Sequence, residues 1–433
     1  METDISYTKA EKSKTYVGAT LGYLFDGYNL LLTTFLVVTL ATYFGVTPKA
    51  IVFAITLALV GSVIGGIFFG WLADRIGRRT TLLVTIVLFG IATIITGTSR
   101  TLDEFYLLQF IAGIGVGGEW GVGFSMLNEA WGTKSRGLAG GFLQAMFPAG
   151  GLLGAVTAGV MLGAYGGDLG WRYSYYFVGI LSLVLLAFRF FVPESKVWKA
   201  QVKAKLEGKN ANELLMKSPL SEIFSKETLR WTIFGTLMVF GFMFFFYSGQ
   251  VFYPTFFKTV GQVPDVSVTL IVTIGSVLGI IAEVVIGGSN DLLGRKKSGI
   301  IFGVISIIVV FPFLYTAMNP TIFSGIGSYP SFYTYGLLYF FQASYAALFG
   351  VWLGEHYPTR MRATGSNFCY MVGRGFGGGL APIIVPILAV SVGGLGVSMS
   401  IGMIIGAVVM TIGALGLKET KGVKITEVDA ASA

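Results

Sequence analysis

The chain has 433 residues, of which 54% are hydrophobic and only 12% are charged, and its formal net charge is +8 at pH 7. With a mean hydropathy of +0.75, this composition excludes an ordinary soluble globular protein and indicates an integral membrane protein. In a soluble protein, an excess of basic residues would suggest binding to nucleic acid. Here it lies in loops between apolar segments, so we expect a lipid bilayer and no nucleic acid as partner.

About twelve apolar segments follow one another, each near the roughly 20 residues that a helix needs to cross the hydrocarbon core. They lie near 15–43, 50–72, 80–98, 104–129, 137–164, 172–193, 230–257, 266–288, 298–318, 331–355, 363–391 and 394–417. The longest polar interruption, 194–229, separates six segments from six. We therefore predict an all-α membrane protein with a six-helix bundle over 1–193, a cytoplasmic linker over 194–229, and a second six-helix bundle with a short tail over 230–433.

Lysine and arginine concentrate in the loops on one side of the predicted bundle, including both termini and the linker. The other side carries only Lys49, Arg100, Arg172 and Lys258. Because basic loops stay in the cytoplasm, this asymmetry predicts a multi-pass protein of the plasma membrane with both termini cytoplasmic.

Two short loop motifs each occur twice. Residues 70–79 and 287–296 both read G-x-x-x-D-x-x-G-R-[KR], and residues 129–136 and 355–362 both read E-x-x-x-T-[KR]-x-R. The chain is therefore composed of two related halves. Acidic and basic residues at this spacing in short loops resemble the signature of the major facilitator superfamily of secondary transporters.

This resemblance implies twelve transmembrane helices in two pseudo-symmetric bundles that alternate access to a central site. It places helices 1, 4, 7 and 10 around the central cavity and helices 2, 5, 8 and 11 along the interface of the halves. It also implies that the charged loop residues form a cytoplasmic latch, one cluster in each half; the alternative is that they only fix loop topology. The latch residues would be Asp74, Arg78, Glu129 and Arg136, and, in the second half, Asp291, Arg295, Glu355 and Arg362.

Shorter sequence motifs indicate which branches of this superfamily the chain resembles. Residues 193–195 (P-E-S) and 418–422 (K-E-T-K-G) resemble the helix ends of sugar porters and their organic-acid relatives. The glycine-rich stretch 113–121 resembles that of proton-coupled organic-acid symporters, such as the lactate and sialate families. Residues 26–29 resemble the D-G-Y-D of aromatic-acid symporters, with Asn29 in place of the second acid. Position 109, where many proton-coupled relatives carry arginine, is Gln109.

Four charged residues fall inside the predicted helices: Asp26, Glu119, Glu283 and Arg374. A charge in the hydrocarbon costs at least about 2.5–3.5 kcal/mol, so such residues are functional candidates. A guanidinium can hold a carboxylate bidentately, and we predict that Arg374 docks an anionic substrate. A carboxyl group in a low-dielectric cavity can exchange a proton near neutral pH, and we predict that Asp26 or Glu119 carries it.

The alternative is that Arg374 pairs permanently with Asp26 or Glu119 and only holds the halves together. Glu283 is expected nearer the cytoplasmic end, where it could contact the motif residues. Polar and aromatic residues at helical spacing extend the predicted substrate site, since a buried amide or hydroxyl needs a partner. They are Tyr23, Asn29, Gln144, Tyr247, Gln250, Gln342, Tyr345 and Asn367.

These features predict a secondary active transporter that couples protons to the uptake of a small organic anion, a monocarboxylate, and that works as a monomer. A neutral sugar or polyol is the alternative substrate, favoured by the helix ends and disfavoured by Arg374. A sensor on the same scaffold is the alternative of another class. We expect no enzyme, no cofactor and no metal, because the chain has one cysteine, Cys369, and no nucleotide or hydrolase motif.

Overall fold

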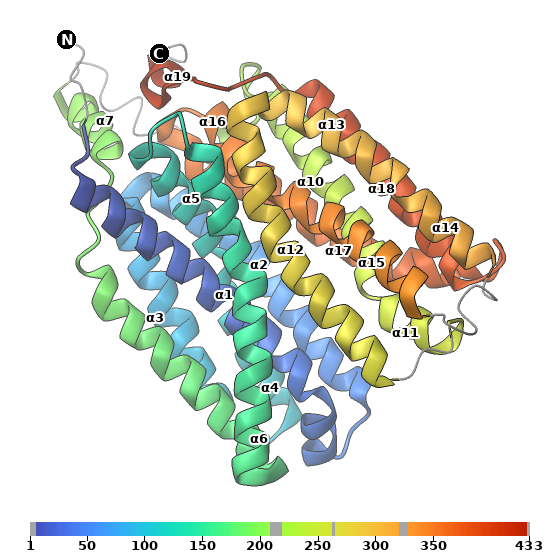
Figure 1. The fold of residues 1–433 in the computed structure, drawn as a ribbon. Helices are drawn as coiled ribbons and strands as arrows, with labels where there is room; N and C mark the ends of the chain where they lie inside the picture. Colours follow the sequence, from blue (N-terminus) through green and yellow to red (C-terminus); the bar gives the residue numbers. More distant parts are fainter. Residues whose placement is uncertain (1–5, 208–218, 262–264, 320–327, 431–433) are drawn as a thin grey trace.

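The structure, a computed structural model, describes residues 6–207, 219–261, 265–319 and 328–430 (Figure 1). Within these ranges the chain is helical, without a β-strand. The first half contains α1 (Lys9–Phe44), α2 (Pro48–Ile76), α3 (Arg78–Thr96), α4 (Leu102–Gly117), α5 (Glu119–Ala130) and α6 (Arg136–Arg189).

Two glycines decide how these helices are counted. Gly118 interrupts one crossing and separates α4 from α5. Conversely, the 54 residues of α6 would be about 80 Å long as a straight helix, far more than the roughly 30 Å hydrocarbon core. Gly166, with a φ of 73°, breaks α6 into two helices that run in opposite directions. The first half therefore crosses six times, as predicted.

The second half contains six further crossings among the described residues. They are α10 (Leu229–Gln250) with α11 (Tyr253–Thr259), α12 (Asp265–Leu293), α13 (Arg295–Ile308) with α14 (Val310–Met318), α15 (Ser328–Ser344) with η2 (Tyr345–Leu348) and α16 (Phe349–His356), η3 (Thr359–Met361) with α17 (Arg362–Ala389), and α18 (Leu395–Gly416). The predicted linker contains α7 (Lys196–Glu207) and α9 (Pro219–Glu222), and its residues 208–218 lie outside the described ranges; the tail ends in α19 (Ile425–Ala430).

The internal repeat is visible in how α3 and α13 begin. Gly77 and Gly294 have φ values of 103° and 98°, which favour glycine, and each precedes a new helix directly. Glu194 accepts hydrogen bonds from the first backbone N–H groups of α3 at 3.0–3.2 Å, and Glu419 does so for α13 at 2.8–3.2 Å. Burial raises the pKa of Glu419, but the backbone N–H donors that surround it outweigh this effect and hold its pKa below the usual value.

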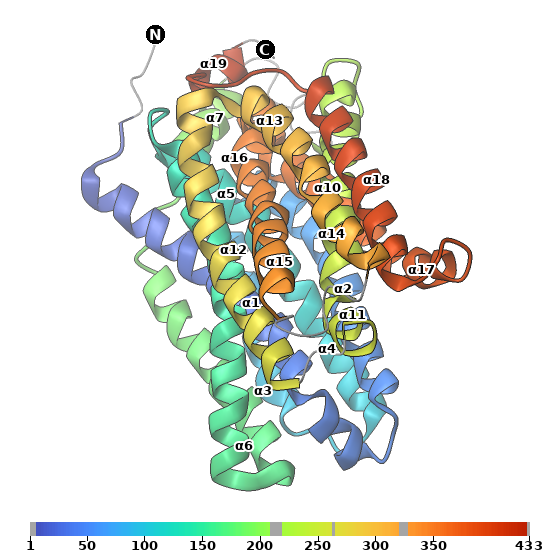
Figure 2. The ribbon, with the colours of Figure 1, turned by 45° about the vertical axis from the view of Figure 1, so that its right-hand side comes forward.

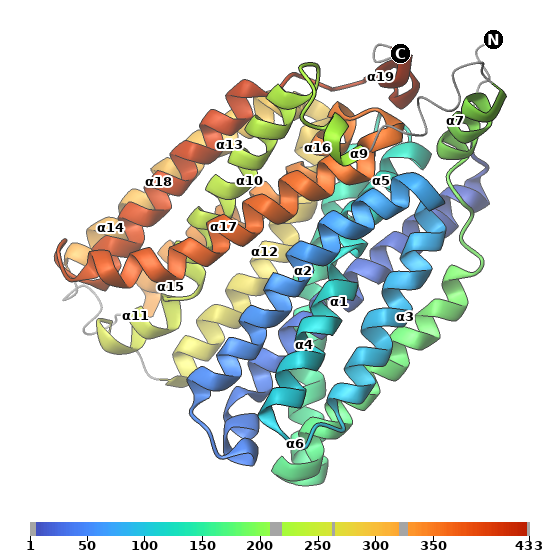
Figure 3. The same cartoon turned by 180° about the vertical axis from the view of Figure 1, so that it is seen from behind.

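The two halves meet along two helix pairs. The first part of α6 packs on α12 (Figure 1), and α2 packs on α17, as the view from behind shows (Figure 3). At the first contact, a Cβ on Gly141 would lie 2.8 Å from the Cα of Gly287, so only small residues permit this approach. This arrangement confirms that the second, fifth, eighth and eleventh crossings form the interface.

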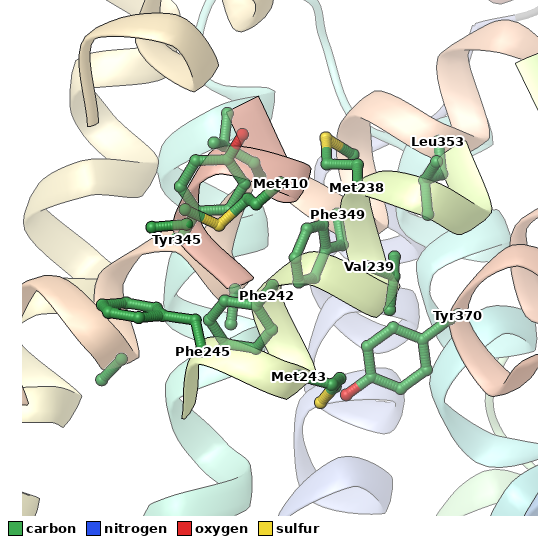
Figure 4. Close-up of a cluster of buried hydrophobic side chains, with 14 of the residues drawn as sticks. Met238, Val239, Phe242, Met243, Phe245, Tyr345, Phe349, Leu353, Tyr370 and Met410 are labelled. Atoms are coloured by element: carbon green, nitrogen blue, oxygen red, sulfur yellow. The ribbon is translucent and has the colours of Figure 1, made fainter. Parts of the chain in front are cut away.

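The largest apolar core lies mainly in the second half, where α10, α16, α17 and α18 converge. Figure 4 shows its aromatic and methionine side chains, among them Phe242, Phe349 and Met410. Tyr370 of α17 stands at the edge of this core, next to Met243 (Figure 4). The core therefore supports one wall of the space between the halves.

Candidate functional site

A cavity of about 410 Å³ lies between the halves, a volume suited to a small molecule. Its walls come from α1, α6, α10, α12, α15, η2 and α17. Most of its lining is aromatic or aliphatic, and a few polar side chains interrupt it. The lining includes the side chains of Tyr23, Gln144, Phe147, Phe246, Tyr247, Gln250, Glu283, Tyr339, Tyr370 and Arg374.

Five of the predicted substrate contacts line this cavity, and four do not. Arg374, Tyr23, Gln144, Tyr247 and Gln250 are part of its wall. Asn29 instead donates a hydrogen bond to the hydroxyl of Thr93. The reason is geometric: Tyr23 and Asn29 are six residues apart, so their directions on the helix differ by about 120°. The spacing i, i+3 keeps neighbours on one face but not a run of three.

The remaining three contacts are used within the protein. The carbonyl oxygen of Gln342 accepts a hydrogen bond from Tyr253 at 2.9 Å, within the second half. Tyr345 is 0% exposed and packs on Phe242 in the core. Asn367 accepts a hydrogen bond from the backbone N–H of Gly121 at 3.1 Å, which joins the halves. The Tyr345 hydroxyl and the Asn367 Nδ2 atom have no hydrogen-bond partner among the described residues, but none of the three residues lines the cavity.

Arg374 reaches the cavity as a cation without an acidic partner. Its side chain is buried, and its guanidinium carbon lies 5.5 Å from the ring centre of Phe147 on the opposite half. No ion pair or hydrogen bond of this guanidinium occurs among the described residues, and the predicted alternative of a permanent pair with Asp26 or Glu119 is absent there. Its N–H donors are therefore available to a ligand.

Glu119 is occupied by a residue that the sequence analysis missed. Arg189, at the end of α6, donates two hydrogen bonds to the Glu119 carboxylate, one of 2.8 Å from Nη1 to Oε1. The hydroxyl of Thr85 donates a further bond to the same carboxylate. Glu119 does not line the cavity, and this pair lies inside the first half. Arg189 lies in the segment predicted over 172–193, so it was a fifth intramembrane charge that the sequence could have indicated.

Asp26 lies next to this pair but outside the cavity wall. It is 2% exposed, and its Oδ1 atom has no hydrogen-bond partner among the described residues. Gly22, one helical turn earlier, lies so close that a Cβ there would be 2.5 Å from the Glu119 carboxylate. The first half therefore holds a buried ion pair with an unpaired carboxyl group beside it.

Glu283 is placed differently from the prediction. It lines the cavity instead of contacting the motif residues, is 4% exposed, and has an Oε2 atom with no partner among the described residues. Asp291, two turns further along α12, is the residue that reaches the motif cluster. Among the described residues that line it, the cavity thus contains one cation and one acidic side chain, and neither forms an ion pair there.

Side chains from both halves close one end of the cavity. Trp120 of α5 stacks on Tyr370 of α17, with ring centres 3.7 Å apart and planes at 12°. The indole N–H of Trp120 donates to Gln144 at 2.9 Å, and Gln144 donates to Tyr23 at 3.2 Å. The hydroxyls of Tyr23 and Tyr370 are 3.4 Å apart. Trp120 was not predicted as a site residue, because a single aromatic residue beside a charge gives no indication of a contact across the halves.

The face of the protein that carries the loop motifs is here called the motif face. The halves are also in contact between this face and the closed end of the cavity. The side chain of Asn128 donates to the backbone oxygen of Gly350 across the halves at 2.9 Å. In the opposite direction the cavity wall continues from Tyr23 to Phe35 along α1 and from Gln144 to Ala155 along α6. The cavity therefore extends away from the motif face, toward the opposite side.

All eight predicted latch residues take part in ion pairs, but their grouping differs from the prediction. Arg78 binds Asp74 and Glu129, each at 3.0 Å, as expected. Glu129, however, is also paired with Arg362 of the second half at 2.8 Å. The prediction of one cluster within each half is therefore wrong.

The second cluster likewise contains an arginine from the opposite half. Glu355 binds Arg295 of its own half at 3.2 Å and Arg136 of the first half at 2.8 Å, and Arg295 also binds Asp291 at 2.9 Å. In each cluster one arginine thus comes from the opposite half. Asp74 and Asp291 add to this exchange, because each accepts backbone N–H groups at the start of a helix of the other half, α17 and α6 respectively.

Because Asp74 binds the start of α17 in the other half, we predict that Asp74→Asn opens the motif face. Asp74 accepts bonds from the N–H and hydroxyl of Thr364 at 2.8 and 2.7 Å, and hydrogen bonds to a charged group contribute about 1.5–3 kcal/mol. We expect the population that is open at the motif face to rise about tenfold or more. The measurement is the labelling rate of a reporter cysteine at Val351 (Val351→Cys), which faces Gly140 across the halves, in a Cys369→Ser background.

Asp168→Asn, which changes an exposed acid two residues after the break of α6 at Gly166, is the control for Asp74→Asn and should leave the labelling rate unchanged. If Asp74→Asn also labels at the parent rate and transports normally, the motif only fixes loop topology.

Residues 19–382 match the family model of the Major Facilitator Superfamily. The chain belongs to this superfamily. Among curated relatives it is 26% identical over 425 residues to a probable 4-methylmuconolactone transporter of Cupriavidus pinatubonensis, covering 98% of this chain and 94% of the relative. It is 25% identical to the sialic acid transporter NanX of Escherichia coli, with 90% of both chains covered. It is 27% identical to the cis,cis-muconate transport protein of Acinetobacter baylyi, covering 86% of this chain and 87% of that one.

Solved structures of this superfamily share the fold. The proton:xylose symporter XylE bound to 6-bromo-6-deoxy-D-glucose superposes with a TM-score of 0.78 at 22% identity, covering 98% of this chain and 100% of XylE. A partially occluded inward-open conformation of XylE from E. coli gives a TM-score of 0.65 at 22% identity, covering 96% and 99% of the two chains. The major facilitator fold and the transporter class predicted from the sequence are confirmed, and the chain is a membrane-spanning transporter of small molecules and not an enzyme.

Proposed function

We propose that this protein is a proton-coupled symporter of a small organic carboxylate, with the motif face in the cytoplasm. The observation that carries the proposal is the unpaired guanidinium of Arg374 in the cavity between the halves. A buried cation without a counter-ion is costly, and a carboxylate ligand supplies the missing charge and hydrogen bonds. The basic loops, which lie on the motif face, support its cytoplasmic location.

The relatives support an anionic substrate, since several are named as transporters of sialic acid, muconate or niacin. A neutral sugar remains the second candidate because XylE shares the fold, but at 22% identity that likeness concerns the fold alone. A sugar would leave the charge of Arg374 without a counter-ion, and for this reason we favour the carboxylate.

We assign the proton to Asp26. Glu119 is neutralised by Arg189, whereas Asp26 is buried beside this pair without an ion pair of its own among the described residues. A carboxyl group in this position is more easily buried with its proton than without it. We propose that Asp26 takes up the proton while the cavity faces outward and releases it when the halves rock, as the inter-half arginines of the latch separate from Glu129 and Glu355.

The test is uptake into proteoliposomes with the acidic solution outside. We expect the wild type to accumulate a carboxylate substrate, and a protonophore should abolish accumulation but permit exchange. Asp26→Asn mimics the protonated state, so it should retain binding and counterflow and lose accumulation. Glu104→Gln, an exposed acid at the start of α4, is the control and should behave as the wild type. Accumulation that follows sodium and ignores pH would contradict proton coupling.

A further inference from the structure

The cavity contains an acidic side chain whose role the proposed symport does not explain. Glu283 comes from α12, which packs on α6 and α15 (Figure 2), whereas Arg374 comes from α17, which packs on α10 and α2. The two side chains therefore reach the cavity from different walls. They form no ion pair with each other within 4 Å among the described residues.

Nothing else in the described protein neutralises Glu283. Arg136, at the start of α6, and Arg295, which follows α12, bind acids of the motif clusters instead: Arg136 binds Glu355, and Arg295 binds Asp291 and Glu355. A buried carboxylate that lacks both a counter-ion and hydrogen-bond donors is expensive to keep in a protein interior. Glu283 is therefore placed to receive a partner from outside the chain.

A second unpartnered acceptor lies in the same cavity. The side-chain oxygen of Gln250 on α10 has no hydrogen-bond partner among the described residues. Around these two acceptors the wall is aromatic, including Phe246, Tyr247 and Tyr339. Acceptor oxygens together with aromatic faces are the surroundings that a cationic nitrogen prefers, because the ring faces carry negative potential. A plain monocarboxylate would supply neither a cation nor a donor to this part of the wall.

We propose that the cavity selects zwitterionic carboxylic acids, whose carboxylate binds Arg374 and whose cationic nitrogen lies against Glu283 and the surrounding rings. This substrate class rests on the proposed function, because it requires the carboxylate to be docked by Arg374. A zwitterion leaves neither buried charge uncompensated, whereas an anion satisfies Arg374 and leaves Glu283 without a partner. Because the two side chains come from different walls of the cavity, they can contact two separate charged groups of one ligand.

The test compares three probes of similar size by calorimetry on the purified full-length protein at one pH. Benzoate carries a carboxylate only, N-methylnicotinate carries a carboxylate and a fixed ring cation, and N-methylnicotinamide carries the cation only. We expect the wild type to bind N-methylnicotinate at least tenfold more tightly than either other probe. In Glu283→Gln this preference over benzoate should fall by at least tenfold, while benzoate itself binds as before or more tightly.

Asp103→Asn, an exposed acid outside the cavity, is the control and should keep the wild-type preference. The proposal is overturned if the wild type binds N-methylnicotinate no better than benzoate, a result that needs no variant. It is also overturned if Glu283→Gln alters both probes equally. If Arg374→Gln weakens both carboxylates while Glu283→Gln changes nothing, the carboxylate site stands and only the zwitterion is wrong. If Arg374→Gln leaves benzoate binding intact, the proposed function itself fails.

Discussion

Arg374→Gln should weaken the binding of a carboxylate substrate by roughly 10–150-fold. The substitution removes a charge-assisted interaction, which contributes about 1.5–3 kcal/mol, and Arg374 is the only cationic side chain among the described residues that line the cavity. Arg374→Lys keeps the charge but loses the planar fork that holds both carboxylate oxygens, so its affinity should lie between those of Arg374→Gln and the wild type. Calorimetric titration of each purified variant measures the effect.

The control is Arg100→Gln, which removes an exposed arginine that does not line the cavity and should leave the affinity unchanged. Thermal unfolding of each variant without ligand separates a binding defect from a folding defect. If Arg374→Gln binds the carboxylate as the wild type does while Asp26→Asn does not, the anion is docked elsewhere and the neutral-sugar alternative gains support.

Arg189→Met should lower the free energy of unfolding by about 3–5 kcal/mol. The substitution leaves Glu119 charged and buried without its counter-ion, and breaking such a pair from one side is strongly destabilising. The guanidinium also donates a hydrogen bond to the backbone oxygen of Leu82 at 2.9 Å, and the substitution removes this donor as well. Denaturation by SDS in mixed micelles would measure the change.

The double substitution Glu119→Met with Arg189→Met is the decisive comparison. Because it removes both charges and fills their volume with apolar atoms, it should recover most of the lost stability. Equal destabilisation by the single and the double substitution would show that packing, and not the ion pair, stabilises this part of the first half. Normal stability of Arg189→Met with loss of proton-driven uptake would instead place the pair in the coupling mechanism.

The helices and their repeat were predictable because the bilayer imposes strong rules on sequence. Each crossing needs a long apolar run, and a polar loop must follow it. The paired motifs then related the halves, and in the structure Gly77 and Gly294 occupy equivalent positions with similar backbone angles. Arg374 was recognisable as a cavity residue because a lone charge in an apolar helix has few other uses.

The contacts between segments were not predictable in the same way, because a single sequence carries no distances. The exchange of Arg136 and Arg362 between the clusters depends on how the halves pack, which motif spacing alone does not reveal. Arg189 was overlooked because it lies at a helix end, where a basic residue usually faces the membrane surface. The position of Glu283 depends on the direction in which α12 turns its side chains, and hydropathy leaves that direction open.

The most direct test of the central account is a thermal-unfolding screen of the wild type with matched acids and neutral compounds. A ligand that binds only the folded protein at one hundred times its Kd stabilises it by about 2.7 kcal/mol. We predict that benzoate and N-methylnicotinate raise the unfolding temperature, that benzyl alcohol and D-xylose do not, and that Arg374→Gln removes the response to the acids. If D-xylose stabilised both the wild type and Arg374→Gln, and neither acid had an effect, the result would contradict the carboxylate site.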